Sequence, residues 1–156
     1  MQITILTVGK TKTPFFQDGE REYFARIKHY TRLQIKSVRS EKIKSGVSDE
    51  IVLKGEGEKI LKQILPQSYV VALDLTGKQL SSEELAAEIQ GWQNSSVREV
   101  VFVIGGALGL DPEVLHRANL IISLSKMTFP HEMCPLILFE QLYRAFSILR
   151  GEKYHK

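Results

Sequence analysis

Short apolar runs separated by amphipathic segments recur along the chain and predict alternating strands and helices. The apolar runs span residues 2–8, 33–38, 69–74, 98–104 and 120–124. The segments with helical spacing span residues 14–31, 48–65, 112–117 and 136–149, and a further helix begins at residue 81. Most of the runs are apolar on both faces, as is typical of buried parallel strands, whereas residues 33–38 alternate between apolar and polar. The pattern therefore predicts one α/β domain over residues 1–156, with a mostly parallel sheet of five to six strands.

Capping and turn residues support several of these boundaries. Pro14 suits the first turn of a helix. Ser81 is a typical N-cap, and acidic residues follow it in the first turn. Thr76-Gly77 is expected to close the third strand, and Gly55 and Gly57 weaken the helix before it.

The composition is that of an ordinary globular protein. Of the 156 residues, 43% are hydrophobic and 25% are charged, and no apolar run approaches the roughly 18 residues of a membrane span. The N-terminus lacks the basic lead of a signal peptide, and the single Cys134 excludes an internal disulfide. We therefore expect a cytoplasmic protein without a membrane association. The net charge of +3 permits an anionic partner without requiring one.

Three of the expected strand ends are polar or rich in glycine, which is where parallel sheets bind ligands. They are Leu73-Asp74, Gly105-Gly106 and the segment 124–129. The glycines do not have the spacing of a dinucleotide fingerprint, and the chain has no phosphate-binding loop of the G-x-x-x-x-G-K-[ST] type. A turn of this kind is more often structural than ligand-binding.

His131 and Cys134 form a pair, but a zinc site needs three or four ligands and no second cluster is present, so we expect no metal. Cys134 is more readily explained as buried apolar filler than as a nucleophile. The helix at 136–149 is apolar on most of its circumference, which predicts a core helix that also contributes to a homodimer interface.

An ordered set of motifs places the chain near a known family. The motifs are Gly105-Gly106 after Val-Phe-Val-Ile, the segment Leu-Ser-Lys-Met-Thr-Phe-Pro-His ending at 131, Glu140-Gln-Leu-Tyr-Arg-Ala, and the closing Tyr154-His155-Lys156. Over nearly its whole length the chain resembles the bacterial large-subunit rRNA pseudouridine N3-methyltransferases, which are SPOUT methyltransferases. The resemblance implies a C-terminal trefoil knot, S-adenosylmethionine as methyl donor, and a homodimer with its active site between subunits. It also implies methylation of N3 of a pseudouridine in helix 69 of 23S rRNA in the assembled ribosome.

The resemblance assigns the cofactor pocket to residues at the three strand ends. They are Leu73, Gly105, Leu124, Ser125, Lys126, Met127, Thr128 and Phe129. Leucine and methionine side chains suit the flat faces of adenine, and backbone groups can bind its edge. Without the resemblance, the apolar members of this set would equally be plain core residues.

The closing motif is assigned to the substrate side of the site. Tyr154 and His155 are the principal catalytic candidates, because a phenol stacks on bases and an imidazole titrates near neutrality. His131 and Arg144 are further catalytic candidates. The residues expected to bind RNA phosphates are Arg150, Lys153 and Lys156. The alternative for these terminal residues is a frayed, solvated end.

The sequence departs from the family at Pro135, where relatives usually carry an arginine. A cation that contacts phosphate or the cofactor carboxylate is lost there, unless Arg144 or Lys126 replaces it. Two other functions therefore stay open: a noncatalytic ribosome- or RNA-binding module, and a SPOUT methyltransferase that acts on tRNA.

Overall fold

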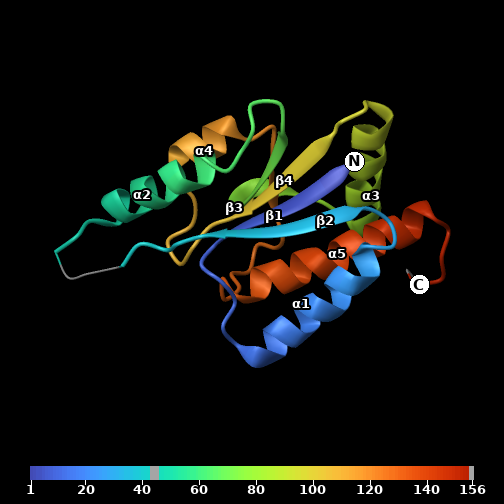
Figure 1. Ribbon diagram of the computed structural model, residues 1–156, viewed down its shortest axis with the longest axis horizontal. Coiled ribbons are helices and arrows are strands. Elements are labelled where there is room, and N and C mark those ends of the chain that lie inside the picture. Colours follow the sequence, from blue (N-terminus) through green and yellow to red (C-terminus); the bar gives the residue numbers. More distant parts are fainter. Residues whose placement is uncertain (43–45, 155–156) are drawn as a thin grey trace.

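Five parallel strands and five helices form the domain in a computed structural model that describes residues 1–42 and 46–154 (Figure 1). The strands are β1 (Gln2–Val8), β2 (Arg32–Val38), β3 (Tyr69–Gln79), β4 (Glu99–Ile104) and β5 (Leu120–Ser123). The helices are α1 (Pro14–Ile27), α2 (Asp49–Leu61), α3 (Ser82–Asn94), α4 (Pro112–Arg117) and α5 (Met133–Leu149). The strand order is β2-β1-β4-β3-β5, and every pairing is parallel. The predicted fold class is confirmed.

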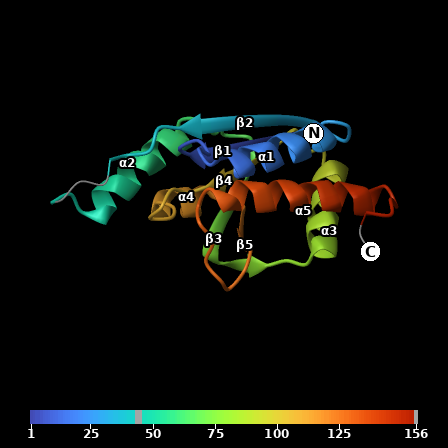
Figure 2. The ribbon, with the colours of Figure 1, turned by 90° about the horizontal axis from the view of Figure 1, so that it is seen from below.

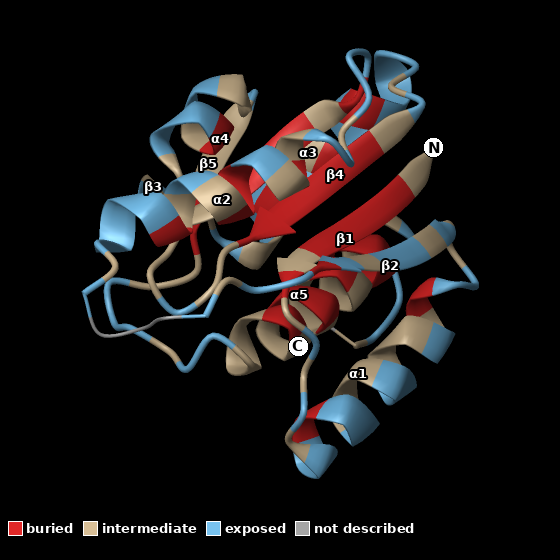
Figure 3. Cartoon of the chain, turned by 60° about the vertical axis from the view of Figure 1, so that its left-hand side comes forward, coloured by how far each residue is buried: buried red, intermediate tan, exposed pale blue. Residues whose placement is uncertain are grey.

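The alternation of side chains along the strands explains why helices cover both faces of the sheet. In β1, Ile3 and Ile5 belong to a core with α1, α3 and α5, whereas Leu6 and Val8 belong to a second core with α2 and α4. The central strands are buried between the two cores (Figure 3). Each fully buried isoleucine contributes roughly 1.5–3 kcal/mol through removal of apolar surface from water.

Helix α5 lies beside α1 and also packs against α3 (Figure 2). Leu138, Phe139 and Leu142 of this helix are buried in the first core, which confirms the predicted core helix. A β-carbon at Gly19 would lie 2.8 Å from Cδ1 of Leu136, so the glycine allows α1 and α5 to approach closely. In the part of the chain that the structure describes, no helix is long and apolar enough to cross a membrane.

Side-chain caps begin three of the helices. At α3, Ser81 Oγ accepts from the Glu84 N–H at 3.1 Å and Glu84 Oε2 accepts from the Ser81 N–H at 2.7 Å, which completes a capping box. At α2 the Ser48 side chain accepts from the Ile51 N–H, and at α4 the Asp111 side chain accepts from the Glu113 N–H. The predicted cap at Ser81 is confirmed.

The prediction that Thr76-Gly77 closes the third strand is wrong, because β3 continues to Gln79. Its pairing with β5 is interrupted after Leu73 and resumes at Lys78. A β-carbon on Gly77 would lie 2.5 Å from the carbonyl carbon of Ile122, so glycine is required for β3 to pass the backbone of β5. The interruption frees residues 74–76 from the ladder at the carboxyl edge of the sheet.

Three helix boundaries also differ from the prediction. Helix α1 ends at Ile27 and α2 ends at Leu61, each four residues before the expected end. Helix α5 begins at Met133 and therefore includes Pro135 in its first turn. Proline is tolerated there because the first N–H groups of a helix have no intrahelical acceptor.

Candidate active site

A cavity of about 670 Å³ opens at the carboxyl ends of β3, β4 and β5. Its walls come from three segments: residues 73–76 after the interruption of β3, the turn 104–109 after β4, and residues 123–131 together with Cys134 after β5. The size is within the usual range of sites for small organic ligands, about 300–1,000 Å³. The three strand ends singled out in the sequence therefore meet in one place.

The turn after β4 folds so tightly that glycine is needed for its own backbone. A β-carbon on Gly105 would lie 2.2 Å from the carbonyl oxygen of Gly109. Gly109 has a φ of +90°, and its N–H donates to the Gly106 carbonyl oxygen at 3.1 Å. Gly105 lines the cavity as predicted, and its lack of a side chain also serves the turn itself.

The segment after β5 is held by hydrogen bonds of its own serines. Ser123 Oγ donates to the Ser125 carbonyl oxygen at 2.9 Å, and the Met127 N–H donates to Ser125 Oγ at 2.9 Å. Among the predicted cofactor residues, the members that line the cavity are Leu73, Gly105, Leu124, Ser125, Met127, Thr128 and Phe129. Lys126 is exposed and is not one of the lining residues.

Several lining residues were not assigned to the cofactor pocket from the sequence. Asp74 brings a carboxylate to the wall, and its Oδ1 accepts from the Thr76 N–H at 2.9 Å and from Thr76 Oγ1 at 2.6 Å. Leu75 is 62% exposed at the same wall. In the sequence, Asp74 is marked by its position at the end of a buried run. Leu75 and Thr76 carry no such signal, and they line the cavity because the pairing of β3 is broken there.

His131 and Cys134 lie at the lip of the cavity. Burial raises the pKa of the Cys134 thiol, so the thiol is protonated and a poor nucleophile at neutral pH. His131 is exposed and stands directly before the first turn of α5. Among residues 1–42 and 46–154, no group of three or more histidine, cysteine, aspartate and glutamate side chains is placed to hold a metal ion.

Pro135 does not line the 670 Å³ cavity. It is buried, and it lines a second cavity between the sheet, α1 and the start of α5. It also lines the small crevice between the two cavities, together with Gly105.

Tyr154 packs against the surface of α1 and α5. Its hydroxyl group lies 3.1 Å from the Tyr23 hydroxyl and donates to Glu140 Oε1 at 3.2 Å. The Arg144 guanidinium lies 4.8 Å from the centre of the Tyr154 ring and is paired with Glu140. Burial and the hydrogen bond with Tyr23 raise the pKa of the Tyr154 phenol well above its ordinary value. In this arrangement Tyr154 is a hydrogen-bond donor and not a proton acceptor.

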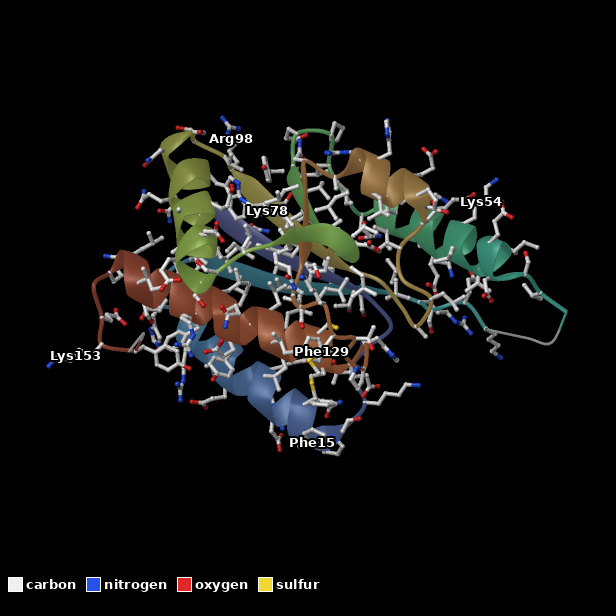
Figure 4. All side chains as sticks on the ribbon, turned by 180° about the vertical axis from the view of Figure 1, so that it is seen from behind. Phe15, Lys54, Lys78, Arg98, Phe129 and Lys153 are labelled. Carbon is white, nitrogen blue, oxygen red and sulfur yellow. The ribbon has the colours of Figure 1, made fainter. Side chains whose placement is uncertain are left out.

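The tail residues lie far from the cavity of their own chain. Helix α5 begins beside the cavity and has 17 residues, a length of roughly 25 Å. Lys153 is at the other end of this helix from Phe129 (Figure 4). Arg150 and Lys153 are exposed, and His155 and Lys156 lie outside the described residues. The structure thus gathers all but one of the predicted cofactor residues at one site, and it places Arg144, Tyr154, Arg150 and Lys153 elsewhere.

Comparisons with known proteins show the family of the chain. A family model described as "Predicted SPOUT methyltransferase" matches residues 1–155. The chain is 48% identical, over 159 residues and the full length of both proteins, to the ribosomal RNA large subunit methyltransferase H of Carboxydothermus hydrogenoformans. It also resembles the solved structure of a probable methylase family protein from Haemophilus influenzae Rd KW20, with a TM-score of 0.53 and 16% identity over 99% of this chain and 70% of that one. The last likeness concerns the fold alone.

Proposed function

The chain belongs to the SPOUT methyltransferase family, and from this premise we propose that it methylates large-subunit ribosomal RNA with S-adenosylmethionine as donor. The observation that carries the proposal is the 48% identity over the full length to a large-subunit rRNA methyltransferase. The cavity at the carboxyl edge supports the proposal, because its size suits a small organic cofactor. We extend the proposal to the cytoplasm, where ribosomes are present.

The residues of the cavity fit S-adenosylmethionine. Leu73, Leu124 and Met127 provide apolar surface for adenine, and the glycine turn exposes backbone groups without a β-carbon in the way. The Asp74 carboxylate is an acceptor for ribose hydroxyl groups or for the ammonium group of the methionine moiety. When it is bound, the cofactor supplies a methyl group on a positively charged sulfur. The family's trefoil knot is part of the same proposal for the segments that form this cavity.

A homodimer is the second part of the proposal. Helices α1 and α5 leave apolar and aromatic side chains half-buried or exposed on their outer face, among them Phe15, which is 65% exposed. Half-buried residues on these helices also include Tyr23, Ile137, Tyr143 and Ile148. A second copy related by a twofold axis across this face would lie antiparallel along α5. The C-terminal end of the partner's α5 would then lie near the cavity, whereas the chain's own α5 ends far from it.

The target atom is proposed to be N3 of a pseudouridine in the helix 69 loop of the assembled ribosome. This imide nitrogen must lose its proton before its lone pair can bond to a methyl carbon. His155 is the proposed proton acceptor because imidazole titrates near neutrality. Tyr154, with its raised pKa, is proposed to position the base or to donate a hydrogen bond. Arg150, Lys153 and Lys156 would neutralise RNA phosphates.

Methyl transfer to ribosomes tests the proposal directly. Purified protein and labelled S-adenosylmethionine should transfer about one methyl group to each ribosome that lacks the modification, and mass spectrometry should place it on pseudouridine N3. Incorporation into tRNA and not into ribosomes would contradict the rRNA assignment. Binding to ribosomes without incorporation would instead indicate a noncatalytic module.

A further inference from the structure

A second cavity, of about 500 Å³, lies at the carboxyl ends of β1 and β2. It is enclosed by the sheet, by α1 and by the first turns of α5. Its lining residues come from these elements and from the loop between β1 and α1: Ile5, Thr7, Lys10, Thr11, Gln17, Glu20, Arg21, Phe24, Ile35, Ser37, Pro135 and Phe139. None of the residues proposed above to bind the cofactor, to accept the proton or to bind RNA phosphates lines this second cavity.

A crevice of only about 10 Å³ lies between this cavity and the cofactor cavity. With the second cavity it shares Thr7, Lys10, Thr11 and Pro135, and with the cofactor cavity it shares Ile104, Gly105 and His131. The three spaces follow the sheet order from β2 through β1 and β4 to β3. The two cavities therefore lie next to each other along the carboxyl edge of the sheet and share one wall.

The chemistry of the second cavity suits a nucleotide. The half-buried Phe24 ring lines the cavity beside Ile35, which is 45% exposed although it is a large apolar residue, whereas Phe139 belongs to the buried core behind them. Lys10 brings a cation to the rim, and Arg21, which is paired with Asp18, brings a second. Aromatic surface binds any unpaired base through its faces, and cations bind the phosphates on either side of it.

The wall between the two cavities is fixed before any ligand binds. Glu132 accepts from the Lys12 and Thr13 N–H groups at 3.2 and 3.1 Å, which fastens the β1–α1 loop to the start of α5. Thr11 Oγ1 donates to Glu20 Oε1 at 2.5 Å, which fastens the same loop to α1. The half-buried Glu20 carboxyl group also presents oxygen atoms that can accept from the amino groups of a base.

We propose that the second cavity binds an unpaired nucleotide of the RNA substrate, in the same loop as the nucleotide that is methylated in the first cavity. This inference rests on the proposed function and extends it, because it adds a substrate subsite next to the cofactor cavity. Binding two nucleotides of one loop would fix the position of the target base, and it requires no separate RNA-binding domain. Such positioning is the main catalytic contribution that a bound substrate loop can receive.

A bulky substitution in the second cavity tests the inference. Ser37 is exposed on β2 and lines the cavity, so Ser37→Trp fills it without disturbing the core. We expect KM for ribosomes to rise about tenfold or more, which corresponds to the loss of one stacked base, while kcat and the affinity for S-adenosylmethionine stay within about twofold. The matched control is Gln34→Trp, on the same strand but with its side chain on the opposite face, and it should leave KM unchanged.

Cross-linking identifies the occupant. A photoreactive benzoylphenylalanine at position 37 should cross-link to rRNA within the loop that contains the methylated nucleotide. A cross-link to a second copy of the chain, or the absence of an RNA cross-link, would overturn the inference, as would equal KM values for the two tryptophan variants. If the unsubstituted protein methylates no ribosomal substrate, the proposed function itself fails and the subsite fails with it.

Discussion

Close backbone approaches at single residues shape the candidate site. A β-carbon on Gly105 would lie 2.2 Å from the Gly109 carbonyl oxygen in its own turn, and one on Gly77 would lie 2.5 Å from the Ile122 carbonyl carbon of β5. The sequence placed Gly105 in the site for access of a ligand to the backbone, and the tightness of the turn became clear only in the structure. The sequence placed Gly77 in a turn, since glycine after threonine is typical of one. A glycine in a turn is easily recognised in the sequence, whereas the atoms that its missing β-carbon would meet are known only from the fold.

Glu132 gives a prediction at the same scale. Its carboxylate accepts from the Thr13 hydroxyl at 2.6 Å and from two backbone N–H groups, and the Thr13 hydroxyl bond holds the pKa of Glu132 below its ordinary value. A pKa that is lower in the folded state means that the ionised form stabilises the fold above the ordinary pKa of glutamate, about 4.3. We therefore expect Glu132→Gln to lower the melting temperature at pH 7. The difference from the unsubstituted protein should shrink as the pH falls through the folded pKa.

Thermal unfolding followed by circular dichroism from pH 7 down to acid conditions measures this difference. Glu58→Gln, on the exposed side of α2, is the control for the loss of a surface carboxylate. A Glu132→Gln difference that stays the same at every pH would contradict the argument. The substitution is also expected to loosen the wall between the two cavities and hence to raise KM for ribosomes.

At the scale of elements, periodicity and caps predicted the secondary structure well, but not its interruptions. All five strands and five helices were expected, because apolar runs and amphipathic segments alternate so regularly. The sequence did not predict the break in β3. Residues 74–76 are unpaired because of the way β3 packs against β5, and β5 is too distant in the sequence for a local pattern to indicate this contact. The residues that the break frees line the cavity, so the site depends on the irregular part of the strand.

The capping box of α3 supplies a prediction for a helix far from the chemistry. Ser81→Ala removes the side-chain acceptor of the Glu84 N–H and should cost about 1 kcal/mol of stability. For a domain of this size the melting temperature should fall by roughly 2–4 °C. Ser95→Ala, at the exposed C-terminal end of the same helix, is the matched control. Calorimetry that finds equal melting temperatures for the two variants would contradict a stabilising role for the box.

At the scale of the whole molecule, the two halves of the predicted site lie at opposite ends of α5. The sequence separation between Phe129 and Tyr154 is short, yet a rigid helix of roughly 25 Å stands between them. The order of the motifs therefore predicted one site made of cavity residues and tail residues. Within a single chain, however, Phe129 and Tyr154 lie at opposite ends of α5. In an antiparallel pair, the N-terminus of one α5 lies near the C-terminus of the other. The proposed dimer therefore brings the tail of one chain to the cavity of its partner.

Complementation between two inactive variants tests this arrangement. Thr128→Trp blocks the cavity from an exposed position, and His155→Ala removes the proposed proton acceptor of the tail. Each homodimer should be nearly inactive in methyl transfer. Co-expression in equal amounts should give heterodimers as half of all dimers, each with one intact pair of cavity and tail. The mixture is therefore expected to show about a quarter of the unsubstituted activity per dimer.

The control is a chain that carries both Thr128→Trp and His155→Ala, co-expressed with the unsubstituted chain. It distinguishes a site shared between subunits from a site within one chain. With a site shared between subunits, its heterodimer has a defect in both sites: one lacks the open cavity and the other lacks the tail histidine. Its activity should then come only from the unsubstituted homodimers, again about a quarter of the full value. With a site inside each chain the same heterodimer keeps one intact site, so the mixture would retain about half, and the two single variants would show no recovery at all. That pair of outcomes would refute the shared site, because only a tail acting on the partner's cavity makes the two mixtures equal.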